Sequence, residues 1–260
     1  MTWKDIEWPD VPFDLEVSMV LAGRRGSEAH GTYIPPTEPD AVDDRDIMAI
    51  CVPPANYYLG LSKWEGAEAM KGQWDVVLYE YRKFVRLLMK QNPNVIGMLW
   101  LEPEDYLFRT PAGDLLIEKR HLFRHRSAAF NAFTGYAYSQ LKKMKGGEYR
   151  GYMGARRKAL IEKHGFDTKN ASHLVRLLHT GEEYLRTGEM QVRRTWDRDM
   201  LIAIKRGEWP LERVQRYAET YFAKCDTALA QSSLPAELDV DAVEKIVLAT
   251  LCYMRAGTTR

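Results

Sequence analysis

The pattern of apolar and polar positions changes near the middle of the chain. In the first part, short apolar runs bounded by turn-forming or charged residues have the length of strands, and they lie at 16–22, 46–52 and 75–79. After the third run, apolar residues from Tyr81 to Leu88 recur at helical spacing, which predicts a helix over 80–89. This helix must end before Pro93, because proline disfavours helical geometry in the residue before it. This part is therefore predicted to be mixed α/β.

Strand-like runs become rare beyond residue 118, and apolar residues then recur every three or four positions. This spacing predicts helices over 127–144, 155–163, 171–185, 198–204, 211–229 and 240–254. Of the remaining segments, 95–100 is an apolar run of ambiguous type and 110–114 is predicted to be a turn. The expected fold class is α+β, with a mixed-sheet domain over 1–118 and an all-helical domain over 119–260, basic in its first part.

The composition is that of an ordinary soluble globular protein. The chain has 260 residues, 45% hydrophobic and 28% charged, which allows one large domain or two small ones. Its apolar runs are far shorter than the ~20 residues of a membrane helix, and no secretory signal is visible. The three cysteines (Cys51, Cys225 and Cys252) lie far apart. This excludes a disulfide scaffold or a cysteine zinc site and favours a reducing, cytoplasmic location.

The net charge of +1 conceals an asymmetry. From Lys119 to Lys169 there are 13 Lys or Arg residues against 3 Asp or Glu residues, so this segment carries +10 and the rest of the chain −9. Tyr136, Tyr149 and Tyr152 are interleaved with the basic residues, an arrangement that suits single-stranded nucleic acid. A solvated basic helix surface with tyrosines packed beneath it has the same pattern, so both interpretations stay open.

Residues suited to chemistry lie around the first strands. Gly26-Ser27 follows the first strand, and such a turn can bring backbone N–H groups and a hydroxyl close to a phosphate, because glycine has no Cβ. Asp44 and Asp46 open the second strand two residues apart, so their carboxylates face the same side and suit Mg²⁺. Asp75 opens the third strand. If the strands are neighbours, the three acids converge into a two-metal site for phosphoryl transfer.

This ordered set resembles the DNA polymerase β-type nucleotidyltransferase superfamily, whose pattern is Gly-Ser, a nearby Gly, then Asp-x-Asp and a carboxylate on a third strand. The stretches 75–94 and 165–178 resemble its RNA-ligase-associated branch, called RlaP, which also occurs in phages. The resemblance extends over about residues 17–235. It departs from the pattern directly before Gly26, where many members have a hydrophobic residue and this chain has Arg25.

The resemblance implies a Mg²⁺-dependent nucleotidyltransferase on a nucleotidyltransferase-type mixed sheet. Such an enzyme moves a nucleoside monophosphate from an NTP to a hydroxyl and releases pyrophosphate. It implies two Mg²⁺ ions, or Mn²⁺ in their place, held by Asp44, Asp46 and Asp75. Gly26 and Ser27 would then cradle the phosphates of the NTP.

Cations that bind the nucleotide are expected on two helices. Lys83 lies on the helix after the third strand and can reach a triphosphate, although an exposed helix cation explains it equally well. Lys169 lies at the start of a later helix, where free N–H groups favour anions. The N-cap of that helix is expected to be Thr168 or Asn170.

His173 and Arg176 are three residues apart and share one face of the same helix. The resemblance assigns both residues to the nucleotide. In the alternative interpretation they pair with acids on the helix surface, such as Glu182 or Glu183, and have a structural role only.

The basic segment and the resemblance favour an RNA end as the acceptor, for example a tRNA 3′ end, and RNA repair as the setting. Two alternatives stay open. In one, the same chemistry modifies a protein side chain, as in toxin–antitoxin pairs, or a small molecule. In the other, the chain is a nucleic-acid-binding module with a relict site, although intact Asp44, Asp46 and Asp75 argue against this.

Overall fold

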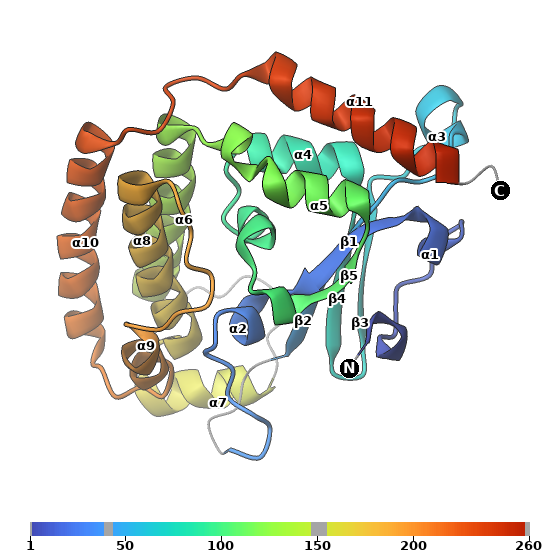
Figure 1. Ribbon diagram of the computed structural model, residues 1–260. Coiled ribbons are helices and arrows are strands. Elements are labelled where there is room, and N and C mark those ends of the chain that lie inside the picture. The colour runs from blue at the N-terminus through green and yellow to red at the C-terminus, as the bar shows by residue number, and fades with distance from the viewer. Residues whose placement is uncertain (1, 39–43, 147–154, 258–260) are drawn as a thin grey trace. The chain divides into compact units, whose positions relative to one another are not determined.

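The computed structural model describes residues 2–38, 44–146 and 155–257 (Figure 1). The chain forms two compact units. The first contains Met1–Ala29, Asp44–Arg124 and Glu237–Arg260, and the second contains His30–Asp43 and His125–Ala236. The domains predicted from the sequence, 1–118 and 119–260, differ from these units in three ways. The predicted boundary lies before Arg124, the 30–43 segment was placed in the first domain, and the last helix was placed in the second.

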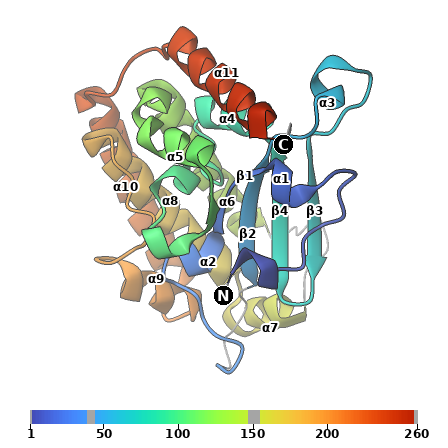
Figure 2. The same cartoon turned by 45° about the vertical axis from the view of Figure 1, so that its right-hand side comes forward.

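The first unit is built on a five-stranded mixed sheet with strand order β3-β4-β2-β1-β5. The strands are β1 Met19–Arg24, β2 Arg45–Cys51, β3 Gly66–Lys71, β4 Trp74–Glu80 and β5 Tyr106–Arg109. The β2–β4 pair is parallel, and the other pairs are antiparallel. Figure 2 shows β2, β4 and β3 lying next to one another.

One face of this sheet is packed into an apolar core. Ile47 and Ala49 of β2 and Val76 and Leu78 of β4 are buried on this face, with tryptophans of the N-terminal segment packed against them. Because successive side chains of a strand point to opposite faces, Asp46 and Asp75 project from the other face. The core therefore orients the two acids.

Helices of the first unit are α1 Leu15–Ser18, α2 Gly26–Ala29, α3 Asn56–Leu59, α4 Tyr81–Met89, α5 Pro111–Glu118 and α11 Val240–Gly257, together with short 3₁₀ turns. Helix α4 begins where the buried carboxylate of Glu80 accepts hydrogen bonds from the N–H groups of Arg82 and Lys83. Two acceptor bonds at the N-cap satisfy donors that a helix start otherwise leaves free.

In the part that the structure describes, the regular secondary structure of the second unit is entirely helical. It consists of α6 Arg126–Gly146, α7 Ala155–His164, α8 Thr168–Thr187, α9 Arg198–Lys205 and α10 Leu211–Gln231. Helix α8 is central and packs against α6, α9 and α10. Its close approach to α6 depends on Gly181, where a Cβ would lie 2.8 Å from the Cβ of Phe133. None of the helices in the described ranges combines the length and apolar character of a membrane span.

Three local predictions were wrong. Residues 15–18 form the turn of helix α1, so the first strand starts later than expected. The 110–114 segment is a helix start, because Thr110 is an N-cap that accepts from the Gly113 N–H and Pro111 takes the first helical position. The N-cap of α8 is Asp167, whose carboxylate accepts from the Asn170 N–H at 3.0 Å. Strands β3 and β5 were not predicted.

Candidate active site

Two acids lie side by side on the sheet of the first unit. Asp46 and Asp75 are register partners in the parallel β2–β4 pair, and neighbouring strands are about 4.8 Å apart. Their side chains are 23% and 33% exposed. This position leaves both carboxylates accessible while the strands that carry them stay rigid.

Arg25 lies between the two carboxylates. Its Nη2 atom is 3.3 Å from Asp75 Oδ2 and 3.8 Å from Asp46 Oδ1, and its backbone N–H donates to the Asp46 carbonyl at 2.9 Å. Two like charges on adjacent strands repel each other, and the guanidinium offsets this repulsion. The acid pair is therefore a site that attracts positive charge.

The Gly26-Ser27 turn packs directly against Asp46. Gly26 has a φ of +60°, and a Cβ on it would lie 2.7 Å from Asp46 Cγ and still nearer to Oδ2. Glycine is thus required both by the backbone conformation and by the space. The Ser27 hydroxyl is buried and has no hydrogen-bond partner among the described residues. It is available to donate to an oxygen atom of a ligand.

Asp44 is exposed and lies one residue before β2. Among the described residues, no group of three or more His, Cys, Asp or Glu side chains is placed to hold a metal ion. The acids that the structure brings together are therefore Asp46 and Asp75, and Asp44 lies outside this pair. Two adjacent carboxylates still fit Mg²⁺, which uses few protein oxygens and takes its other ligands from water and phosphate.

Lys83 lies on the first turn of α4, in the first unit. Its ammonium is 5.5 Å from the centre of the Tyr79 ring. Tyr79 is four residues from Asp75 on β4, so the two side chains share a face of the strand about 13 Å apart. Lys83 is thus on the correct side of the sheet but makes no direct contact with the acids in the described residues.

A cluster of cations lies in the second unit around His173 and Arg176 of α8. Arg176 is half-buried, and burial together with the nearby Arg194 lowers its pKa to about 10, so it stays charged at neutral pH. Burial, with a contribution from Arg176, holds the pKa of His30 well below its usual range. Lys169 is half-buried in the first turn of the same helix.

The acids proposed as structural partners of this cluster bind other residues. Glu182 pairs with Arg186 at 3.3 Å, and Glu183 pairs with Arg194 at 2.7 Å. Arg176 has no carboxylate within ion-pair distance among the described residues. A half-buried cation beside other positive groups is stabilised when an anion binds, so the cluster suits an anionic ligand.

The tyrosines of the basic segment are only partly described. Tyr136 packs its ring edge against His173, with centroids 5.5 Å apart, and therefore takes part in the cation cluster. Tyr149 and Tyr152 lie outside the described residues. Their proposed role in binding nucleic acid stays a prediction.

Comparison with known proteins places the chain in a family. Residues 11–245 match the family described as RlaP, an RNA repair pathway DNA polymerase beta family. The chain belongs to this family. Its enzymatic class is accordingly that of the nucleotidyltransferases. A solved nucleotidyltransferase-like protein from Exiguobacterium sibiricum 255-15 also matches, with 8% identity over 82% of this chain and 69% of that chain and a TM-score of 0.28. No curated protein matches the chain.

The second unit of this RlaP-family chain contains a buried ionic network that was not predicted from the sequence. Arg194 is fully buried and binds Glu183 and Asp197 through paired hydrogen bonds of 2.7 to 2.9 Å. Asp197 also binds His179 Nδ1 at 2.5 Å. The network joins His179 and Glu183 of α8 to Arg194 and Asp197 of the segment before α9, and local spacing does not signal the contacts between these two segments.

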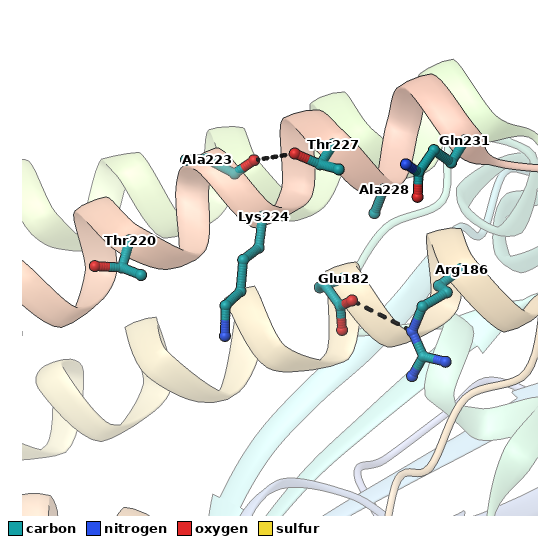
Figure 3. Close-up of a pocket in the computed structure, with 8 residues that line it drawn as sticks. All are labelled: Glu182, Arg186, Thr220, Ala223, Lys224, Thr227, Ala228 and Gln231. Carbon is teal, nitrogen blue, oxygen red and sulfur yellow. Dashed lines mark hydrogen bonds and ion pairs between the residues drawn. The ribbon is translucent and has the colours of Figure 1, made fainter.

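The RlaP-family chain also has a pocket of about 380 Å³ between α8 and α10 (Figure 3). Its lining includes the charged side chains of Arg186 and Lys224 and the hydroxyl groups of Thr220 and Thr227. None of its lining residues was predicted from the sequence to be a site residue.

Proposed function

We propose that the chain transfers a nucleoside monophosphate from an NTP to a hydroxyl group at an RNA end. In this reaction the acceptor oxygen bonds to the α-phosphorus, the bond from that phosphorus to the bridging oxygen breaks, and pyrophosphate leaves. The observation that carries the proposal is the register pairing of Asp46 with Asp75, with Gly26 packed against the first acid, in a chain of the RlaP family.

Residues of the first unit would perform the chemistry. Asp46 and Asp75, with Asp44 as the more exposed third acid, would hold Mg²⁺, or Mn²⁺ in its place, and two ions are expected. When bound, the metal would supply Lewis-acid stabilisation of the phosphoryl oxygens. Asp75 is proposed to favour loss of the acceptor proton. The Gly26 turn and the Ser27 hydroxyl would hold phosphate oxygens, and Lys83 would add positive charge on the same side of the sheet.

Cations of the second unit would bind the anionic part of the nucleotide. An NTP and the carboxylates together carry more negative charge than two divalent ions neutralise, so further cations are needed. Lys169, His173 and Arg176 are proposed for this role, supported by the lack of a carboxylate partner for Arg176 among the described residues.

The basic segment from Lys119 to Lys169 supports RNA as the acceptor, as does the description of the family as an RNA repair pathway. Phosphate contacts by such a segment would make binding salt-dependent, with a log–log slope of about −0.7 per contact on a single strand. A cytoplasmic location remains our prediction from the three separated cysteines.

The decisive experiment incubates the chain with each α-labelled NTP, Mg²⁺ and total RNA, and then locates the label. We expect label in RNA, and more than about a 100-fold loss of transfer in Asp46→Asn and Asp75→Asn, since even supporting residues of metal sites are worth 10–100-fold. The matched control is Asp114→Asn, a surface acid that pairs with Arg109. Label that persists on protein after RNase treatment would favour a protein acceptor, and near-normal turnover in either variant would overturn the proposed site.

Kinetics and melting temperature together test the second-unit cations. We expect His173→Ala and Arg176→Ala to raise KM for the NTP, or to lower turnover, with little loss of melting temperature. A large drop in melting temperature with unchanged kinetics per folded molecule would show that this part of α8 is structural.

A further inference from the structure

An exposed tryptophan lies above the buried ionic network of the second unit. Trp196 is 55% exposed, although its ring is held in place at two points. Its Nε1–H donates to Glu183 Oε1 at 2.6 Å, and the ring stacks on His179 with centroids 4.8 Å apart and an interplanar angle of 26°. Because His179 and Arg194 beneath it are fully buried, the exposed area belongs to the rest of the ring.

The ring is rigid because the residues that hold it are themselves held. Glu183 is bound by Arg194, and Arg194 is bound by Asp197. His179 is fixed between Asp197 and the Tyr217 hydroxyl, 3.1 Å from its Nε2. The indole N–H is already hydrogen-bonded, so a ligand contacts the apolar face of the ring. Because the Trp196 side chain is already held in one conformation, it loses little conformational entropy when a ligand binds.

Further aromatic rings lie beside Trp196, and cations border them. Tyr217 is half-buried, whereas Trp209 and Tyr221 are only 8% and 9% exposed. Tyr217 stacks on Tyr221 at 5.0 Å and contacts Trp209 edge-on at 5.4 Å. The guanidinium of Arg213 lies 3.7 Å above the Trp209 ring, and the ammonium of Lys224 lies 4.0 Å above the Tyr221 ring. The exposed face of Trp196 and the neighbouring cations are the features that single-stranded nucleic acid uses, for its bases and phosphates respectively.

Charges are segregated around helix α10. Arg213, Tyr217, Tyr221 and Lys224 follow one another at helical spacing and form one stripe. The acids of the helix are Glu212, Glu219 and Asp226, which lie roughly 160° away from the stripe by helical geometry. The acids on the facing side of α8, Glu182 and Glu183, are neutralised by Arg186 and Arg194.

Lys224 also belongs to the pocket between α8 and α10, where Arg186, Thr220 and Gln231 add donors and acceptors (Figure 3). We propose that Trp196 and the exposed cations of the stripe along α10, Arg213 and Lys224, form a binding surface for single-stranded RNA. An unpaired base of the RNA stacks on Trp196, and the phosphate backbone of the RNA runs past Lys224 towards this pocket. The proposal deepens the RNA-acceptor part of the proposed function and rests on it.

Binding of a labelled, unstructured oligoadenylate tests this surface without requiring catalysis. A stacked base contributes about 1–3 kcal/mol, so Trp196→Ala should weaken binding between about 5- and 150-fold. Trp196→Phe, which keeps an aromatic face, should retain most of the affinity. Trp196→Ala should leave the salt slope unchanged, while Lys224→Ala should reduce it by about 0.7. Tyr253→Ala, at an aromatic residue of α11 that is 49% exposed, is the control and should bind normally.

Several results would overturn the proposal. If Trp196→Ala binds the oligonucleotide as tightly as the wild-type chain does, Trp196 is not part of an RNA-binding surface. This result would leave the proposed nucleotidyl transfer unaffected. Equal losses in Trp196→Ala and Trp196→Phe at unchanged melting temperature would exclude stacking. If Trp196→Ala instead changes the oligomeric state, the surface is a contact between copies of the chain. A wild-type chain that binds no RNA would overturn the surface and the RNA acceptor together, and transfer from labelled NTP to other acceptors would then be tested separately.

Discussion

Replacement of Gly26 by alanine tests the geometry of the acid pair most directly. The new Cβ would lie 2.7 Å from Asp46 Cγ and nearer still to Oδ2, well inside any normal contact. The contact can be relieved only if the Asp46 carboxylate moves by about 1 Å or more. A displacement of about 1 Å at a reacting centre costs roughly 100-fold in rate, so we expect kcat to fall by about that factor.

The effect of the same substitution on stability should be small. A non-glycine residue in the left-handed region costs about 1–2 kcal/mol, and alanine recovers about 0.4–1 kcal/mol by restricting the unfolded chain. The clash itself adds little to this cost, because the end of the Asp46 side chain can rotate. A net loss of about 1 kcal/mol corresponds to a fall of roughly 2–4 °C in melting temperature.

Gly165→Ala is the matched control. Gly165 has a φ of +78°, and no heavy atom lies within 4 Å of the place that a Cβ would take, so the substitution carries the backbone cost without the clash. Transfer of label from the NTP and thermal melting are measured for both variants. The reasoning is refuted if Gly26→Ala and Gly165→Ala have similar activity, because Asp46 would then not depend on the space beside Gly26.

Three further outcomes are expected. Arg194→Met, which leaves the buried Asp197 and the half-buried Glu183 without their cation, should reduce the free energy of unfolding by about 3–5 kcal/mol. Arg186→Met at a surface pair should cost at most about 1 kcal/mol, and urea unfolding would show whether the two differ. Burial lowers the pKa of His30 in the folded chain, so the unfolded chain binds more protons below about pH 6.5. The free energy of unfolding should therefore decrease as the pH is lowered through this range, and His30→Gln should remove this contribution. Ser27→Ala should raise KM for the NTP about tenfold without affecting melting, since the hydroxyl has no partner in the described residues; unchanged KM would remove Ser27 from the phosphate site.

The helices of the second unit could be predicted from the sequence because their signal is local. Each buries one stripe, so apolar residues recur within a few positions, as in α8 with Leu174, Leu177 and Leu178. The second and third predicted strands were found within a residue or so, as β2 and β4. Strand β3 was missed because it is an edge strand of alternating small and exposed residues, stabilised by pairing with β4. Thr110-Pro111 was read as a turn because a cap and a proline at the first helical position occur in turns as well.

The residue types of the candidate site were likewise visible in the sequence. Asp46 and Asp75 open apolar runs, and Gly26-Ser27 follows one, so the acids and the turn could be named from local pattern alone. Their convergence depends on β2 and β4 pairing in parallel and in register. Hydrogen bonds between segments far apart in the chain decide that pairing, and no local spacing encodes it. Arg25 was known only as a departure from the family pattern, and its position between the two carboxylates emerged from the same pairing.

The Trp196 surface depended on the tertiary structure alone. Trp196, His179 and Tyr217 lie on three separate segments, and none stands in a recognisable motif. Their contacts arise because α8 and α10 pack together and because the buried Arg194 needs the carboxylates of Glu183 and Asp197. Burial of a charge is a property of the packed molecule. The sequence therefore determined which helices form and which acids open the strands, whereas packing decided which side chains meet, because the free energy of burial and ion pairing depends on neighbours that only the folded chain supplies.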